Sequence, residues 1–257
     1  MPDDSTKSDN LRKILVPIAT LATIAFNYLA AIGKINDVTP DRISSLYPTL
    51  LTPAGYAFSI WSLIYIGLIA FSLYQLRADS PTAIRAVRPL YALSCALNVG
   101  WIYCWHHNLI LLSLILIVLL AITLFLIQTF LSSPVSRREY WLTKAPFGLY
   151  FGWVTAASLV NFMVWLRSIG FQMSLQTETE VAITLIAVAT LLAVLVCIRL
   201  RDHIYPLAIA WALTAIAIAQ QGQTAIIGAA AAGVVVSLVT ALSFVISMPA
   251  SKFRRES

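Results

Sequence analysis

The chain has 257 residues, of which 60% are apolar and only 11% are charged. An ordinary soluble domain carries about 25% charged residues, so the composition excludes a soluble globular protein. We interpret the net charge of +6 as a topology signal and an attraction to anionic lipid, not as a nucleic-acid site.

Eight apolar segments follow one another along the chain, joined by short links that leave no room for a separate catalytic domain. A helix of about 20 residues crosses a bilayer, and an open strand edge cannot lie in hydrocarbon. The sequence therefore predicts an all-α polytopic membrane bundle of about eight transmembrane helices. The expected spans are Ile14–Ile32, Tyr56–Leu76, Leu90–Trp105, Leu109–Leu131, Pro146–Trp165, Val181–Ile198, Ile204–Ala219 and Thr224–Ile246. Pro17, Pro89 and Pro146 are expected in first helical turns, where proline is tolerated.

The basic residues predict the orientation of the bundle. With the N-terminus inside, one face receives fourteen of the 17 basic residues, and the other receives only Lys34, Arg42 and Arg167. This asymmetry predicts that both termini face the cytoplasm. The first apolar run is too long for a signal-peptide core, and no cleavage site follows it closely, so we expect it to be retained.

The chemistry-bearing residues exclude several classes of site. No span carries a charged residue near its centre, which disfavours proton pumps, ion-coupled transporters and voltage sensors. The three cysteines lie in apolar spans without CxxC spacing, so we expect neither disulfides nor zinc. His106 and His107 are adjacent without a third ligand nearby, and we interpret them as polar loop residues rather than metal or haem ligands.

Aromatic residues recur at helical spacing on three spans. Each of the three sets occupies one helical face, because residues three or four apart lie above one another. The sets are Phe58, Trp61 and Tyr65; Asn98, Trp101 and Trp105; and Trp153, Ala157, Asn161 and Trp165. If the faces converge, they line a cavity that suits a flat, mostly apolar ligand with polar edges. The alternative is that asparagine joins helices and tryptophan anchors the membrane interface.

Two other segments attract attention. The link from Gly33 to Gly55 is the longest in the chain, and loops of this length are often lids or binding loops. The last span contains a glycine-alanine run from Gly228 to Gly233, which predicts close helix packing within the chain or in a homodimer.

Three ordered motifs resemble the tryptophan-rich sensory protein family, also called TspO/MBR or translocator proteins. Residues 52–65 read TPAGYAFSIWSLIY, residues 90–101 read LYALSCALNVGW and residues 152–162 read GWVTAASLVNF. The family usually has a Pro-Pro pair and then a tryptophan dipeptide, whereas this chain has Thr52-Pro53 followed by Gly55-Tyr56. Its spacing from Phe58 to Trp61 is also one residue shorter than the common form. The resemblance covers about residues 11–167, the family's five-span core, and residues 168–257 add a three-helix segment, as in a long bacterial branch.

The resemblance implies ligand binding in a five-helix bundle that opens toward the first loop. Family members bind tetrapyrroles such as protoporphyrin and haem, so a porphyrin or haem is the expected ligand, with Lys34 and Arg42 available to its propionates. Because the motifs end by Phe162, we expect the last three spans not to line the cavity. The implied location is the bacterial inner membrane. The ligand-binding residues carried over are Tyr56, Phe58, Trp61, Tyr65, Asn98, Trp101, Trp153, Ala157 and Asn161.

Four functions remain open at this point. The first is a receptor or carrier for a tetrapyrrole or another small hydrophobic ligand. The others are a porphyrin-degrading enzyme, a small-solute transporter and a non-catalytic assembly factor of a membrane complex. No nucleophile–base pair favours catalysis, and no broken helix pair or inverted repeat favours a transporter.

Overall fold

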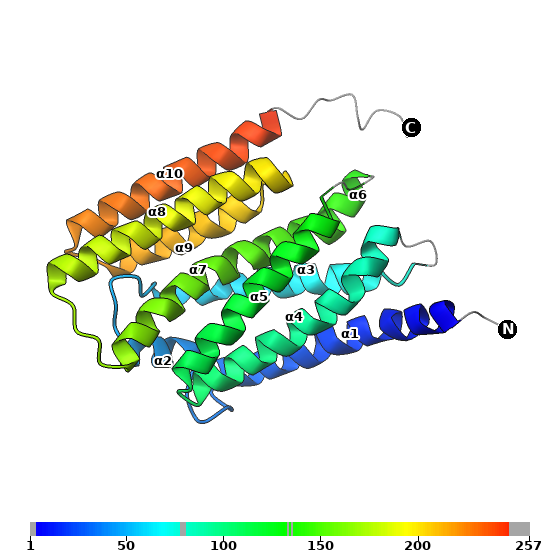
Figure 1. The fold of residues 1–257 in the computed structure, drawn as a ribbon, viewed down its shortest axis with the longest axis horizontal. Helices are drawn as coiled ribbons and strands as arrows, with labels where there is room; N and C mark the ends of the chain where they lie inside the picture. The colour runs from blue at the N-terminus through cyan, green and yellow to red at the C-terminus, as the bar shows by residue number, and fades with distance from the viewer. Residues whose placement is uncertain (1–3, 78–80, 133, 135, 247–257) are drawn as a thin grey trace.

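The computed structural model describes residues 4–77, 81–132, 134 and 136–246. Eight helices of 15 residues or more run side by side in this part of the chain (Figure 1). They are α1 (Asp4–Ala31), α3 (Ile60–Tyr74), α4 (Thr82–His106), α5 (Ile110–Phe130), α7 (Ala145–Ser168), α8 (Leu175–Leu200), α9 (Tyr205–Ala219) and α10 (Thr224–Ile246). The short elements are α2 (Pro40–Leu46), η1 (Gly55–Ser59), α6 (Arg137–Glu139) and η2 (Tyr140–Lys144). The predicted all-α polytopic membrane bundle is confirmed.

Six helical segments of the described chain are long and apolar enough to cross a membrane. The two other long helices are α4 and α9. α4 has sufficient length, but it carries Arg85, Arg88, Asn98 and His106. α9 is apolar but has 15 residues, about 22 Å of helix against a hydrocarbon core of about 30 Å.

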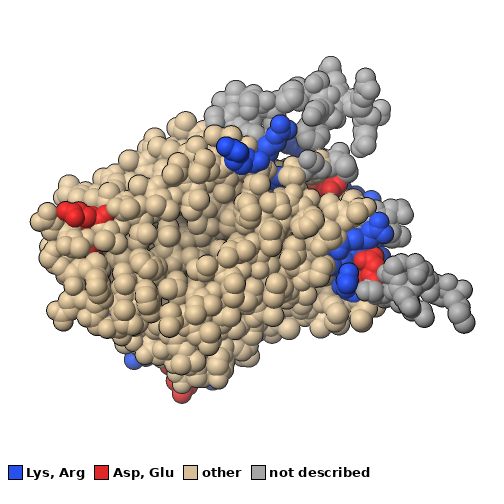
Figure 2. All heavy atoms as spheres, in the orientation of Figure 1, with Lys and Arg blue, Asp and Glu red and all other residues tan. Residues whose placement is uncertain are grey.

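The two ends of the bundle differ in charge. α1 begins and α10 ends at the same end, and Lys and Arg side chains gather there, whereas most of the visible surface is uncharged (Figures 1 and 2). We call this the basic end, and the opposite end, which holds α2 and the first long link, the loop end. Lys252, Arg254 and Arg255 lie outside the described residues, as does the side chain of Lys7.

Two of the proline expectations are wrong. α4 begins at Thr82, so Pro89 lies inside it, and Pro17 lies well inside α1. A proline cannot donate to the carbonyl four residues earlier. For Pro17 that carbonyl belongs to Lys13, and it accepts a hydrogen bond from the Gln75 side chain at 2.9 Å instead. A neighbouring helix thus supplies the donor that proline lacks.

A buried arginine joins three helices at the basic end. Arg88 of α4 is 1% exposed and forms an ion pair with Asp9 of α1 at 2.6 Å. Its guanidinium also donates to the side chain and the backbone carbonyl of Gln75, directly after α3. A buried charge requires such partners, so this network holds the start of the bundle together.

The last three helices pack on the rest of the bundle through α9 and α7 (Figure 1). A Cβ atom on Gly152 would lie 2.6 Å from the backbone oxygen of Tyr205, and one on Gly233 would lie 2.6 Å from Leu213 and Thr190 side-chain atoms. Both glycines therefore permit close helix contact. A Cβ atom on Gly228 would have nothing within 4 Å, so this glycine packs on no other helix of the described chain, and the homodimer stays a prediction. The division of the chain at residue 167 also stays a prediction.

Candidate functional site

Trp61 occupies the centre of an aromatic cluster formed by α3, α4 and α7. Its ring stacks on Tyr65 with centroids 5.5 Å apart. The rings of Tyr150, Trp101 and Trp153 surround it at centroid distances of 5.7, 6.1 and 6.3 Å. The aromatic faces of the second, third and fifth predicted spans therefore do converge.

A small cavity, here called the inner cavity, lies beside this cluster toward the loop end. Its volume is about 40 Å³, enough for a few water molecules. The wall on α7 follows the helical period, because its residues lie three or four positions apart. The lining residues are Ser44, Pro53, Phe58, Trp101, Trp105, Trp153, Ala156, Ala157, Val160, Asn161, Ala212 and Ile216.

Three buried polar atoms of the inner cavity have no hydrogen-bond partner among the residues that the structure describes. They are the Nε1 atoms of Trp101 and Trp153 and the Oγ atom of Ser44, and each of these residues is 4% exposed. An unsatisfied buried donor costs about 1–3 kcal/mol. Asn161 differs, since it accepts from Ser113 at 3.0 Å and donates to the backbone of Ala157. The cavity thus combines apolar walls with free donors.

The predicted ligand-binding residues fall into three groups. Phe58, Trp101, Trp153, Ala157 and Asn161 line the inner cavity, and Trp61 and Tyr65 form the aromatic cluster behind it. The other two predicted residues, Asn98 and Tyr56, take no part in the lining.

Asn98 and Tyr56 have other partners. Asn98 is fully buried and accepts a hydrogen bond from Asn27 of α1 at 2.6 Å, as expected of an amide that joins helices. Tyr56 is 41% exposed, and its ring meets the edge of Trp211 on α9. Lys34 and Arg42 are exposed and do not line the cavity.

The prediction that the last three spans stay clear of the cavity is wrong. Ala212 and Ile216 of α9 form part of its wall. Two small or aliphatic residues one turn apart carry no signal in an apolar span, so sequence reasoning could not find them. Ser44 also lacks any sequence signal that would mark it as a lining residue, whereas Trp105 belongs to the predicted aromatic face of α4.

The histidine pair also differs from its interpretation as loop residues. His106 is fully buried in the last turn of α4, where its ring nitrogen contacts the carbonyl of Ile102 at 2.8 Å. His107 is exposed and stacks on Tyr103. In the described part of the chain, no group of three or more His, Cys, Asp or Glu residues is placed to hold a metal ion.

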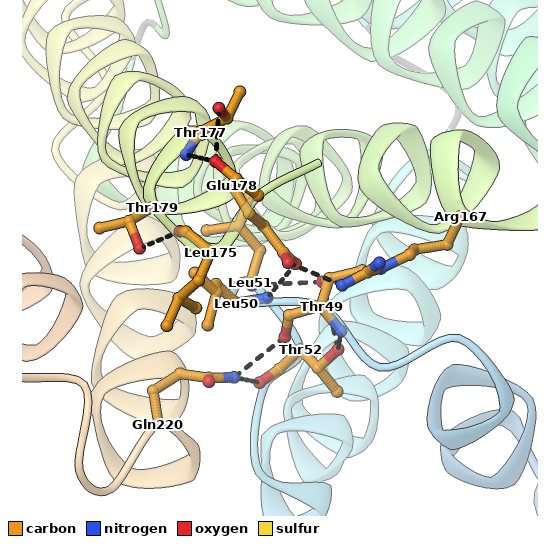
Figure 3. Close-up of polar contacts among 11 residues, drawn as sticks. Thr49, Leu50, Leu51, Thr52, Arg167, Leu175, Thr177, Glu178, Thr179 and Gln220 are labelled. Carbon is orange, nitrogen blue, oxygen red and sulfur yellow. Dashed lines mark hydrogen bonds and ion pairs between the residues drawn. The ribbon is translucent and has the colours of Figure 1, made fainter. Parts of the chain in front are cut away.

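Polar contacts clamp the first long link to the last three helices (Figure 3). Glu178 of α8, only 4% exposed, forms an ion pair with Arg167 at 2.7 Å and accepts from the backbone N–H of Leu50. Gln220 donates to the carbonyl oxygens of Thr49 and Thr52, each at 3.1 Å. These contacts are here called the loop clamp. They hold in place the segment whose Pro53 forms part of the cavity wall.

A second and larger space lies on the side of the bundle between α3, α7 and α9. This lateral groove has a volume of about 560 Å³. Its walls are almost wholly apolar, and it contains none of the cavity-lining residues. The groove is lined by Ser59, Ile60, Leu63, Ile66, Gly67, Ala70, Trp141, Ala145, Pro146, Leu149, Ile204, Leu207 and Trp211.

Buried charges cap helix ends near the groove at the basic end. Lys144 donates to the carbonyls of Ser132 and Leu200, just after α5 and at the end of α8, where a cation is favourable. Asp202 accepts from the backbone N–H groups of Ile204 and Tyr205 at the start of α9. Burial raises the pKa of Asp202 to about 6, against the opposing effects of those N–H groups and the Lys144 charge.

Comparison with known proteins adds one finding. A family model described as TSPO-like protein matches residues 13–244. The match continues past residue 167 and runs through α8 and α9 into α10. No curated protein and no solved structure matches the chain.

Proposed function

Because the chain belongs to the TSPO-like protein family, we propose that it is a membrane receptor or carrier that binds a flat, mostly apolar ligand of the tetrapyrrole class in the inner cavity. The observation that carries the proposal is the set of free donors on Trp101, Trp153 and Ser44 around an aromatic wall. Such a wall suits a conjugated ring.

The free donors also define the polar part of the ligand. An indole N–H donates and cannot accept, so the two tryptophans require acceptor atoms such as carboxylate or carbonyl oxygens. Each new bond contributes about 1 kcal/mol, and a charged acceptor contributes more. A porphyrin carrying propionates has both the ring and the acceptors.

The size of the cavity makes binding depend on movement. Ligand pockets usually measure about 300–1,000 Å³, far more than the present 40 Å³. The loop end is the natural place to open, since α2 and the loop around Pro53 cover the cavity there. We therefore expect the ligand to associate slowly, because the loop clamp must open before it can enter the cavity.

Titration with protoporphyrin tests the proposal. The absorbance of the porphyrin is followed, because removing a tryptophan also removes a fluorescent reporter. Saturation at micromolar concentration is expected, on the order of −8 kcal/mol. Trp101→Phe and Trp153→Phe each remove one donor and should weaken binding about fivefold. Trp165→Phe is the control, because Trp165 does not line the cavity. If Trp101→Phe and Trp153→Phe bind porphyrin as tightly as this control, the ligand site lies elsewhere.

We further propose that both termini face the cytoplasm of a bacterial inner membrane. The excess of basic residues at the end where α1 begins supports this orientation. Reporter fusions after Ser257 and in the link near Asp37 should report opposite sides of the membrane. Equal sidedness would contradict the orientation.

A further inference from the structure

The lateral groove has the features of a lipid site rather than of a second ligand cavity. Its walls come from segments that are long and apolar enough to span a membrane, Gly55–Tyr74 and Arg137–Ser168, together with α9. Leu63, Ile66 and Trp141 on its rim are 57%, 64% and 51% exposed. Exposed side chains on membrane-spanning segments face hydrocarbon, so an acyl chain is the molecule that naturally fills the groove.

The depth of the groove depends on a close contact between two helices. A Cβ atom on Gly67 of α3 would lie 2.8 Å from the Cβ atom of Pro146 on α7. The two helices therefore approach closely along the floor of the groove, where a side chain at position 67 would collide with Pro146. Ala70 and Ala145 continue this row of small residues. The result is a channel between larger walls.

The charge around the groove is one-sided at the basic end. Arg138 lies one turn before the groove residue Trp141, and Arg201 lies three residues before Ile204. Both arginines are exposed. Their acidic neighbours Glu139 and Asp202 are only 3% and 0% exposed, so the charge that meets the membrane surface on these two segments is positive. Trp141 adds a ring of the kind that anchors at headgroup level.

We propose that the lateral groove binds one acyl chain of an anionic phospholipid, with its phosphate against Arg138 and Arg201. The apolar channel selects the chain, and the basic rim selects the headgroup. The proposal is independent of the ligand in the inner cavity, because the two spaces share no residue.

Quenching by brominated lipid tests this site in the full-length protein. Phosphatidylglycerol or phosphatidylcholine with brominated chains is added to the detergent-solubilised protein, and tryptophan fluorescence is followed. Comparison with Trp141→Phe isolates the signal of the groove residue Trp141. Saturable quenching of Trp141 by the anionic lipid, with only a weak linear loss for the zwitterionic lipid, is the expected result. Equal quenching by both lipids would overturn the proposal.

Two matched pairs of variants locate the lipid. Arg138→Gln with Arg201→Asn should lower the affinity roughly twenty-five-fold, because each arginine near the surface contributes about fivefold. Asn suits the left-handed backbone of Arg201, whose φ is 52°. Arg85→Gln is the control at the same end, since Arg85 is exposed on α4. Thermal melting verifies that each variant is folded. If the double variant binds like Arg85→Gln, the headgroup assignment is wrong.

Ala70→Phe fills the channel and should abolish saturable quenching of Trp141. Ile69→Phe places the same ring on an exposed position of α3 outside the groove and should leave the quenching unchanged. If Ala70→Phe instead converts a dimer to a monomer while lipid quenching persists, a second copy of the chain fills the groove and the lipid proposal fails.

Discussion

The inner cavity and the lateral groove share α7, α9 and the short helix η1 but differ in nearly every physical respect. The cavity measures about 40 Å³ and has three polar atoms without a partner in the described part of the chain, whereas the groove measures about 560 Å³ and is almost wholly apolar. Neighbouring residues divide between them: Phe58 lines the cavity and Ser59 the groove, while Ala212 lines the cavity and Trp211 the groove. The space with the hydrogen-bond donors and the space with the larger volume are thus separated by the contact between η1 and α9, here called the seam.

This division gives α9 a role that its composition does not reveal. Consecutive residues of a helix point in different directions, so one apolar helix can close a polar cavity on one side and form a groove on the other. The position of α9 then controls both spaces. Substitutions that move α9 should affect both the cavity and the groove. Substitutions at the loop end or at the basic end of the bundle should affect only one of them.

The largest expected effect comes from Gly152→Val. The new side chain would meet the backbone oxygen of Tyr205 and the Cβ atom of Ala208, so α9 must move away from α7. Overpacking against backbone costs about 3 kcal/mol. The free energy of unfolding in detergent should fall by that amount, and both porphyrin binding and lipid quenching should weaken.

Gly228→Val is the control for this change. A Cβ atom there meets nothing within 4 Å, so stability should change by less than about 0.5 kcal/mol. If Gly152→Val impairs only porphyrin binding or only lipid quenching, α9 is not the shared wall of the two spaces.

The second effect is a pH dependence at the basic end. Burial raises the pKa of Asp202 to about 6 from its ordinary value of 3.8, so the folded protein binds a proton more tightly than the unfolded chain. Stability should therefore fall as pH rises through the interval between these values, by on the order of 2 kcal/mol from pH 4 to pH 6.

Asp202→Asn removes this contribution and still offers an oxygen to the start of α9. Burial lowers the pKa of His203, which gives an opposite slope, but this contribution is present in both proteins and cancels in their difference. Unfolding in denaturant at several pH values measures the difference. Parallel stability curves for the parent and the variant would exclude Asp202 as its source.

The sequence predicts the helices better than it predicts which residues line the cavity. The periodicity of Trp153, Ala157 and Asn161 indicates one face of α7, and the structure places that face on the inner cavity. The first turns of α4 were not predicted as helix because Arg85 and Arg88 interrupt the apolar pattern. The burial of Arg88 is tolerable because its guanidinium is paired with Asp9 and Gln75.

Other parts of the site depend on contacts between residues distant in the chain. Nothing around Ser44 or Ala212 distinguishes these residues from an ordinary link or an ordinary apolar span. Tyr56 belongs to a recognisable motif, yet its partner is Trp211, which is 155 positions later in the numbering. Such pairings follow from the packing of α9, which local patterns do not encode.

The third prediction separates the loop end from the groove. Glu178→Gln keeps an acceptor for Leu50 but removes the ion pair with Arg167. Loss of a charge-assisted bond should cost about 1.5 kcal/mol and let acrylamide quench the cavity tryptophans more strongly. Lipid quenching of Trp141 should not change.

Glu180→Gln supplies the comparison for this clamp variant. Glu180 lies two residues along α8 and is exposed, and its carboxylate accepts a hydrogen bond from the Gln176 side chain. Its stability should stay within about 0.5 kcal/mol of the parent. Equal acrylamide quenching in the two variants would show that the loop clamp does not control access to the cavity.

The smallest effect is expected at the seam itself, where Trp211 donates to the carbonyl of Ala57 at 3.0 Å and contacts Tyr56 edge to face. Trp211→Phe keeps an aromatic ring but removes this hydrogen bond, which in a membrane contributes about 0.6 kcal/mol. Stability should barely fall, yet the two spaces should begin to communicate because the bond closes the gap between η1 and α9. Brominated lipid should then quench Trp153, as measured by the difference that Trp153→Phe makes in the Trp211→Phe background. Trp165→Phe, which touches neither space, should leave Trp153 protected. If Trp153 is quenched equally in the parent protein, the seam is already open to lipid, and the cavity and the groove are two parts of one site.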